Sequence, residues 1–194
     1  MKKILVSFAL FFTACASYEV TPTGHTMKTT TDYMGVITKH SDSVRRYSGF
    51  YNILDMESTI ITSQVAQAQL EQSAMLYQWD EARFAEEKAK FETRLNRESE
   101  IFLSFYTPDR KNDDLFKKNT IWKIFLDVEG KRYEGRATKL KLQLVEIEGL
   151  YPYHNRFYTP YSIIFPVPMR SIEDKPIKLT VTGAVGAGVM EFKP

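Results

Sequence analysis

The spacing of apolar residues predicts a long helix followed by a series of strands. The helical stretch covers residues 63–97, where Ala, Gln, Glu, Lys and Leu dominate and neither Gly nor Pro occurs. Apolar side chains recur in it at seven-residue intervals, at Leu70, Tyr77, Phe84 and Phe91. We therefore predict one helix of roughly nine turns, whose first amides are capped by Thr62 or Ser63.

Beyond the helix the period falls to two residues, which is the period of β-strands. Residues 100–106 are almost continuously apolar, which predicts a central strand covered on both faces. Residues 121–128 alternate and end at Glu129-Gly130, which predicts a hairpin. Further strands are expected at residues 161–167, 177–181 and 189–192. The first of these three is placed at a sheet edge, because prolines follow it closely.

Two segments leave the local structure open. Residues 32–62 contain strand-like runs at 49–54 and 58–62 among polar residues. Residues 140–147 change phase after alternating leucines, which fits either a β-bulge or a helix. The order of elements predicts an α+β fold in which one long helix packs on an antiparallel, β-sandwich-like sheet. Residues 32–194 are expected to form a single globular domain.

The first residues of the chain have the layout of a secretory signal peptide. Two lysines precede an apolar run at residues 4–12, and the small residues Thr13 and Ala14 precede Cys15. The apolar run has about half of the roughly 20 residues that a permanent transmembrane helix needs. We therefore expect residues 1–14 to be removed.

The motif FTAC at residues 12–15 resembles the lipobox of bacterial lipoproteins. In that family the cysteine thiol receives a diacylglyceryl group, the peptide is cleaved before the cysteine, and the new amino terminus is acylated. The resemblance implies that Cys15 is lipidated and anchors the protein in a membrane. Because Ala16 follows in place of Asp, it also implies the outer membrane. Phe12 departs from the leucine that is usual there, and the alternative is cleavage before Ser17, which gives a soluble periplasmic protein.

Cys15 is the only cysteine of the chain, so it cannot form an intrachain disulfide, whereas lipidation gives it a use. Each buried methylene contributes about 0.8 kcal/mol, so several acyl chains would hold the protein stably. Residues 16–31 are rich in Thr, Ser, Pro and Gly. Residues 15–31 are therefore expected to form a lipidated cysteine followed by a flexible tether.

The charge of the chain argues against nucleic acid as a partner. Lys2 and Lys3 supply the whole formal net charge of +2, because no acidic residue precedes Cys15. The chain from Cys15 onward is therefore neutral overall, whereas a nucleic-acid binder is expected to carry a basic excess.

Aromatic residues crowd into the segment 150–161, LYPYHNRFYTPY. Aromatic faces beside Arg and Asn can stack on sugar rings or hold a partner peptide. The other interpretation is an aromatic-rich turn whose hydroxyl groups are solvated. The candidate binding residues are Tyr151, Tyr153, His154, Arg156 and Tyr158.

No catalytic or metal-binding motif stands out in the sequence. It has no nucleophile elbow, no HExxH motif and no cysteine pair, and the run Gly183–Gly188 is followed by too few residues for a phosphate-binding helix. We expect no metal and no cofactor, although a two-carboxylate glycosidase stays open. The expected function is that of a non-enzymatic structural or accessory lipoprotein that contacts an envelope protein. The alternative is a module that binds envelope glycan or peptidoglycan.

Overall fold

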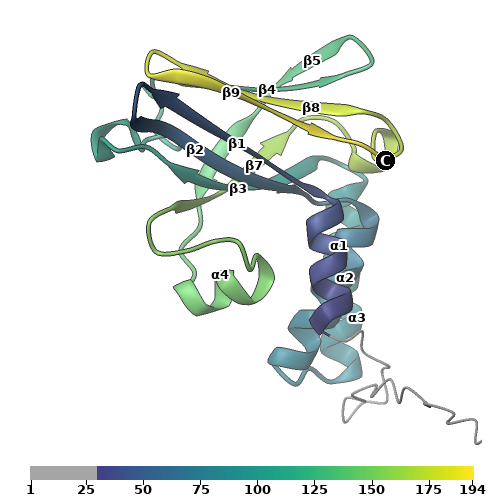
Figure 1. The fold of residues 1–194 in the computed structure, drawn as a ribbon. Helices are drawn as coiled ribbons and strands as arrows, with labels where there is room; N and C mark the ends of the chain where they lie inside the picture. Colours follow the sequence, from purple (N-terminus) through teal and green to yellow (C-terminus); the bar gives the residue numbers. More distant parts are fainter. Residues whose placement is uncertain (1–29) are drawn as a thin grey trace, which may run out of the picture.

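The computed structural model describes residues 30–194, so the predicted signal peptide, Cys15 and most of the predicted tether lie outside the described residues. The described chain is mostly β, with two antiparallel sheets packed face to face (Figure 1). The first sheet contains, from edge to edge, β1 (Ser41–Ser48), β2 (Tyr51–Ile60), β3 (Ser99–Tyr106), β7 (Thr159–Phe165) and β6 (Arg136–Lys139). The second contains β5 (Lys131–Glu134), β4 (Trp122–Val128), β8 (Ile177–Gly183) and β9 (Gly186–Phe192).

Four short helices accompany the sheets in the described part of the chain. They are α1 (Thr30–Lys39), α2 (Ser63–Leu76), α3 (Glu81–Leu95) and α4 (Leu144–Leu150). Single 3-10 turns lie at η1 (Arg110–Asn112) and η2 (Met169–Ser171). The helix α1 begins at Thr30, inside the predicted tether of residues 15–31, and no sequence pattern predicts it.

The prediction of one long helix on a sheet is wrong. The helical stretch is broken between α2 and α3 at Gln78, whose φ of 49° lies in the left-handed region. Asp80 then starts a new helix, because its side chain accepts a hydrogen bond from the backbone N–H of Arg83 at 2.7 Å. Neither Gly nor Pro marks this break. The α+β assignment is therefore replaced by a two-sheet β fold with short helices.

Several local predictions are confirmed. The strand β3 is central in its sheet and almost wholly buried. The strands β4 and β5 form the predicted hairpin, with Glu129 and Gly130 both at positive φ. The open choice at residues 140–147 is settled in favour of a helix, α4. The edge placement of β7 is wrong, because Pro166 and Pro168 follow its last paired residue and β6 pairs with its other side.

The main core lies between the two sheets. Phe105 of β3 meets Trp122 of β4 edge to face, with ring centroids 5.2 Å apart. Ser58 donates its hydroxyl to the Met190 sulfur at 3.1 Å, so this buried polar group is paired. Each large apolar side chain buried here contributes about 1.5–3 kcal/mol relative to exposure. Fully buried members include Leu54, Met56, Ile101, Leu103, Ile163, Leu126, Leu179 and Val181.

The two sheets are joined at both sides. On one side the chain passes from β5 to β6 through Gly135, where a Cβ would overlap the ring of Phe165. On the other side β9 lies along β1, and the backbone N–H of Glu191 donates to Asp42 at 2.7 Å. Gly188 faces Val44 and Met56 so closely that a Cβ would meet Val44 Cγ1 at 2.7 Å. Glycine therefore lets β9 approach β1.

The helices α1, α2 and α3 leave the same end of the five-stranded sheet (Figure 1). The backbone N–H of Ile60 donates to the carbonyl of His40 at 3.0 Å, which holds the last turn of α1 beside the start of α2. Both helices point away from the sandwich, α2 by about 21 Å at 1.5 Å per residue. The first turn of α1 and the turn between α2 and α3 therefore lie at the end that is farthest from the sheets.

Candidate functional site

The segment that follows α4, which contains the candidate binding residues, covers the outer face of the five-stranded sheet (Figure 1). Tyr151 stacks on Phe102 of β3, with ring centroids 3.5 Å apart and planes inclined by 4°. Tyr151 is buried, and burial raises the pKa of its hydroxyl above the ordinary value. One face of the Tyr151 ring is therefore occupied by the domain itself.

Two further candidates, Tyr153 and His154, are held in hydrogen bonds under this segment. The Tyr153 hydroxyl lies 2.6 Å from Thr59 Oγ1, which lies 2.6 Å from Ser41 Oγ. His154 is buried, its Nδ1 lies 2.8 Å from Ser104 Oγ, and burial lowers its pKa. Both side chains fix the segment to the strands beneath it.

The other two candidates, Arg156 and Tyr158, lie nearer the solvent. Arg156 is exposed, and Tyr158 is half-buried beside Tyr106, with ring centroids 5.8 Å apart. Burial and a hydrogen bond to Asp55 raise the pKa of Tyr158 to about 12, so its hydroxyl stays protonated at neutral pH. The structure thus separates the five candidates into three that pack against the sheet and two that remain at the surface.

The sequence-based reasoning missed a group of exposed aromatic side chains at the turn between β1 and β2. Gly49 makes this turn with φ of 61°. We call Tyr47, Phe50 and Tyr51 the hairpin tip. All three are exposed, and Phe50 is fully so. The run Gly49-Phe50-Tyr51 is visible in the sequence, but its aromatic residues predict a strand-like segment, because strands favour such residues, and do not indicate exposure.

The hairpin tip lies at the end of the sandwich opposite to the three-helix end (Figure 1). The turn between β8 and β9 is close to it, since a Cβ on Gly186 would lie 3.7 Å from Ile53 Cδ1. Below the tip, Arg45 pairs with Asp55 at 2.5 Å across the hairpin. Exposed Tyr and Phe side chains on a paired hairpin are typical of contact surfaces, because they offer large apolar area with few rotatable bonds.

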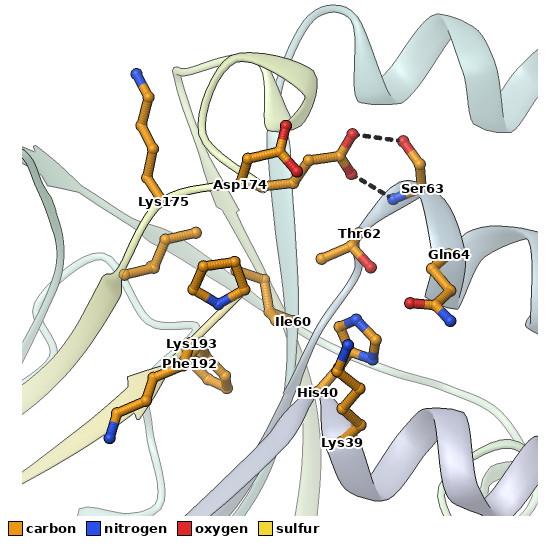
Figure 2. Close-up of a pocket in the computed structure, with 13 residues that line it drawn as sticks. Lys39, His40, Ile60, Thr62, Ser63, Gln64, Asp174, Lys175, Phe192 and Lys193 are labelled. Carbon is orange, nitrogen blue, oxygen red and sulfur yellow. Dashed lines mark hydrogen bonds between the residues drawn. The ribbon is translucent and has the colours of Figure 1, made fainter.

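A cavity of about 290 Å³ lies where α1, α2 and the end of β9 meet (Figure 2). Two acids, Glu173 and Asp174, line it. Glu173 accepts two hydrogen bonds from Ser63, at 2.7 Å from the backbone nitrogen and 2.9 Å from the hydroxyl. Its histidine, His40, has Nδ1 2.8 Å from the carbonyl of Val36 in α1. Glu173 thus caps the positive end of α2, and His40 bonds to a carbonyl in the last turn of α1. Both side chains therefore stabilise helix ends.

A larger groove of about 910 Å³ opens between β6 and the second sheet. Its polar lining includes Lys123 and Glu134, which pair with each other at 2.9 Å. The indole of Trp122, at the base, donates to the carbonyl of Asn112 at 2.6 Å. The groove follows the side of the sandwich where the chain crosses from β5 to β6 through Gly135.

Residues 30–194 contain no group of three or more His, Cys, Asp or Glu side chains placed to hold a metal ion. Within the same residues, no helix has the length and apolar character to cross a membrane. No family model, curated protein or solved structure matches this chain.

Proposed function

We propose that this protein is an outer-membrane lipoprotein, anchored through Cys15, that acts by contact with another protein of the envelope and not as an enzyme. The observation that carries the proposal is the hairpin tip, three exposed aromatic side chains at the end opposite to the helices. The lipid anchor is supported by the FTAC motif at residues 12–15 and by the absence of any other cysteine in the chain.

The position of α1 fits an anchored arrangement. Fourteen residues lie between Cys15 and Thr30, the first residue of α1. A flexible chain of that length spans on the order of 20 Å. The first turn of α1 points away from the sheets, whereas β1 runs about 27 Å in the other direction to the hairpin tip. An anchor at Cys15 therefore leaves the tip facing away from the membrane.

The hairpin tip can supply the energy of such a contact. Aromatic side chains dominate the few residues that carry most of the binding energy in protein interfaces, with losses of about 2 kcal/mol or more on truncation. The strands β1 and β2 are paired along most of their length, up to Ser48 and Tyr51 beside the turn. A paired hairpin loses less conformational freedom on binding than a free loop does.

The anchor is tested by replacing Cys15 with serine. We expect the wild-type protein to fractionate with the outer membrane. We expect Cys15→Ser to become soluble or to keep its signal peptide, because serine has no thiol to which the diacylglyceryl group can be attached. The mass of the mature amino terminus reports the acyl chains directly. A mature chain that begins at Ser17 would show that the protein is soluble and periplasmic.

The contact is tested by placing a photo-crosslinking residue at position 50. We expect a discrete covalent adduct with one envelope protein, lost when Tyr47 and Tyr51 are both changed to serine. The matched control is the same crosslinker at position 157, since Phe157 is also an exposed aromatic residue but lies outside the hairpin tip. Equal crosslinking at both positions would refute a specific contact.

Glycan binding is a second candidate, because Arg156 and Tyr158 remain near the surface. Sedimentation with purified peptidoglycan separates the two functions. Retention of the wild type that is lost in Tyr158→Ala would favour glycan, whereas a wild type that stays in solution would exclude it. Tyr153→Ala is less informative, because loss of the Tyr153 hydroxyl disturbs its hydrogen bond to Thr59.

A further inference from the structure

A second exposed apolar surface lies at the helical end of the molecule. It combines the end of α2 and the residue after it with the start of α4 and Leu142, which lies two residues before α4. We call it the helix-end patch, and it consists of Leu76, Tyr77, Leu142, Leu144 and Val145, all of them exposed. Exposed large apolar side chains that gather in one place mark an interaction surface, whereas single ones are ordinary.

Contacts between α2 and α4 make this surface continuous. The Tyr77 hydroxyl donates to the Glu146 carboxylate at 3.1 Å, which ties the end of α2 to α4. A Cβ on Gly149 would lie 3.6 Å from Leu76 Cδ1, so α4 also approaches the apolar end of α2. Trp79 extends the surface, because its ring stacks with that of Tyr77 at a centroid distance of 6.3 Å.

The helix-end patch faces the side from which the chain continues toward Cys15. The α2 end of the patch and the first turn of α1 both lie at the end far from the sheets, and Figure 1 shows α4 on the same side of the five-stranded sheet. The α1 side chain Tyr33 donates its hydroxyl to the carbonyl of Leu150 at 2.6 Å, which fixes α1 to the end of α4. Thr30, the first described residue, therefore lies at the same end of the molecule as the patch.

We infer that the helix-end patch lies on the lipid bilayer, with Trp79 and Tyr77 at the level of the headgroups. This inference rests on the proposed function, because an anchor at Cys15 is what brings the patch to the membrane. A tether of about 20 Å raises the local concentration of the bilayer next to the patch, so even a weak apolar contact becomes populated.

The chemistry of the patch suits a membrane interface. Tyr and Trp combine an apolar ring with a polar group and favour the boundary between hydrocarbon and water, whereas Leu and Val add apolar area below it. The carboxylates of Asp80, Glu146 and Glu148 flank the patch, while Arg83 lies over the Trp79 ring, 5.8 Å from its centroid. Lys141, which is exposed, precedes Leu142 of the patch, so charges of both signs border it and a zwitterionic lipid surface is the matched probe.

The inference can be tested by tryptophan fluorescence on vesicles. The chain from Cys15 onward is coupled through this single thiol to maleimide-bearing lipid in dioleoyl phosphatidylcholine vesicles, with or without brominated acyl chains. The chain has two tryptophans, and Trp122 is buried between the sheets. We expect brominated lipid to quench the emission by up to about half, since only Trp79 is within reach of the acyl chains.

Two variants provide the controls. Trp79→Phe keeps Trp122 alone and should lose the quenching entirely. Leu76→Ser with Val145→Ser removes apolar area at two exposed positions and should reduce the quenching roughly twofold or more while Trp79 stays in place.

The coupling makes the outcome independent of lipidation in the cell. Equal emission on plain and brominated vesicles, with the protein coupled, would overturn the inference and leave the proposed anchor untouched. Formation of a dimer that hides Trp79 from the brominated lipid would overturn it too, by assigning the patch to a second copy. Quenching together with a cellular amino terminus at Ser17 would support the membrane contact and refute the anchor.

Discussion

At the scale of single residues, His154 shows how the aromatic segment is fixed to the sheet. Its ring is buried beside Ser104 of β3 and packs edge-on to Phe102, with ring centroids 5.9 Å apart. Burial disfavours the charged form of the ring, so the pKa of His154 is lowered from its ordinary value of 6.5. In the folded protein the ring is therefore held neutral.

This burial predicts a loss of stability in mild acid. Between the lowered folded-state pKa and 6.5, the unfolded chain binds more protons at His154 than the folded chain does. The contribution of His154 to the free energy of unfolding is therefore complete above pH 6.5 and decreases as the pH falls from 6.5 through the folded-state pKa. Urea unfolding at about pH 7.5 and about pH 5.5 measures the effect.

The matched variant is His154→Gln, which can still bond to Ser104 but does not titrate. We expect its stability to change less between the two pH values than that of the wild type. The same pH dependence in both proteins would show that other groups carry it.

At the scale of elements, the turn between α2 and α3 decides the helical architecture. Gln78 adopts a left-handed conformation that costs a non-glycine residue about 1–2 kcal/mol. Asp80 offsets part of this cost by capping α3, and Thr62 caps α2 in the same way, with its hydroxyl 3.3 Å from the Val65 nitrogen. The turn also exposes Tyr77 of the helix-end patch and leaves Trp79 half-buried beside it.

The cap predicts the cost of changing Asp80. Asp80→Ala should lower the free energy of unfolding by about 0.5–2 kcal/mol, because it leaves a backbone N–H of α3 without its acceptor. Asp80→Asn should stay close to the wild type, since an amide oxygen can accept the same hydrogen bond. Urea unfolding of the three proteins measures both values, and an equal loss in the two variants would argue against a capping role.

The strands were more predictable than the helices, for a physical reason. Alternation along β4 and the continuous apolar run of β3 report which faces are buried, and burial is what holds a strand in place. The break at Gln78 depends on backbone conformation and on a cap, and helix-favouring residues on both sides hide it. The short helix α1 lies in a mixed stretch, where tertiary contacts such as that of Tyr33 with Leu150 stabilise it.

The candidate site was predictable only in part. The sequence showed that aromatic residues gather near Tyr151, but which of them face the sheet depends on how the segment folds back over β3. The hairpin tip was missed because Phe50 and Tyr51 have the composition of a buried strand, and only the turn at Gly49 exposes them.

At the scale of the whole molecule, the sandwich is closed by the approach of β9 to β1. Arg46 of β1 donates to the carbonyl of Ala187 at 3.2 Å, in addition to the bond between Glu191 and Asp42. Gly188 lies between these contacts and leaves no room for a side chain. The first and last strands of the described fold therefore depend on each other.

This closure predicts that Gly188 is intolerant of even a methyl group. Gly188→Ala should lower the free energy of unfolding by about 1–3 kcal/mol, because the branched side chain of Val44 has to move. Gly35→Ala is the matched control, since a Cβ at this position in α1 meets nothing within 4 Å. It should leave stability unchanged or raise it by up to about 1 kcal/mol. Similar losses in both variants would contradict the close approach.

The dependence of β1 on β9 also sets an order of events during biosynthesis. Asp42 cannot accept its hydrogen bond from Glu191 until that residue, which lies 149 residues further along the chain, has been synthesised. At a translation rate of about 5–20 residues per second, that gap lasts roughly 7 to 30 s. During this time the nascent chain cannot complete its two-sheet sandwich, and the closing contact joins residues far apart in the sequence, which itself slows folding. The contact of β1 with β9 is therefore among the last contacts of the described fold to form.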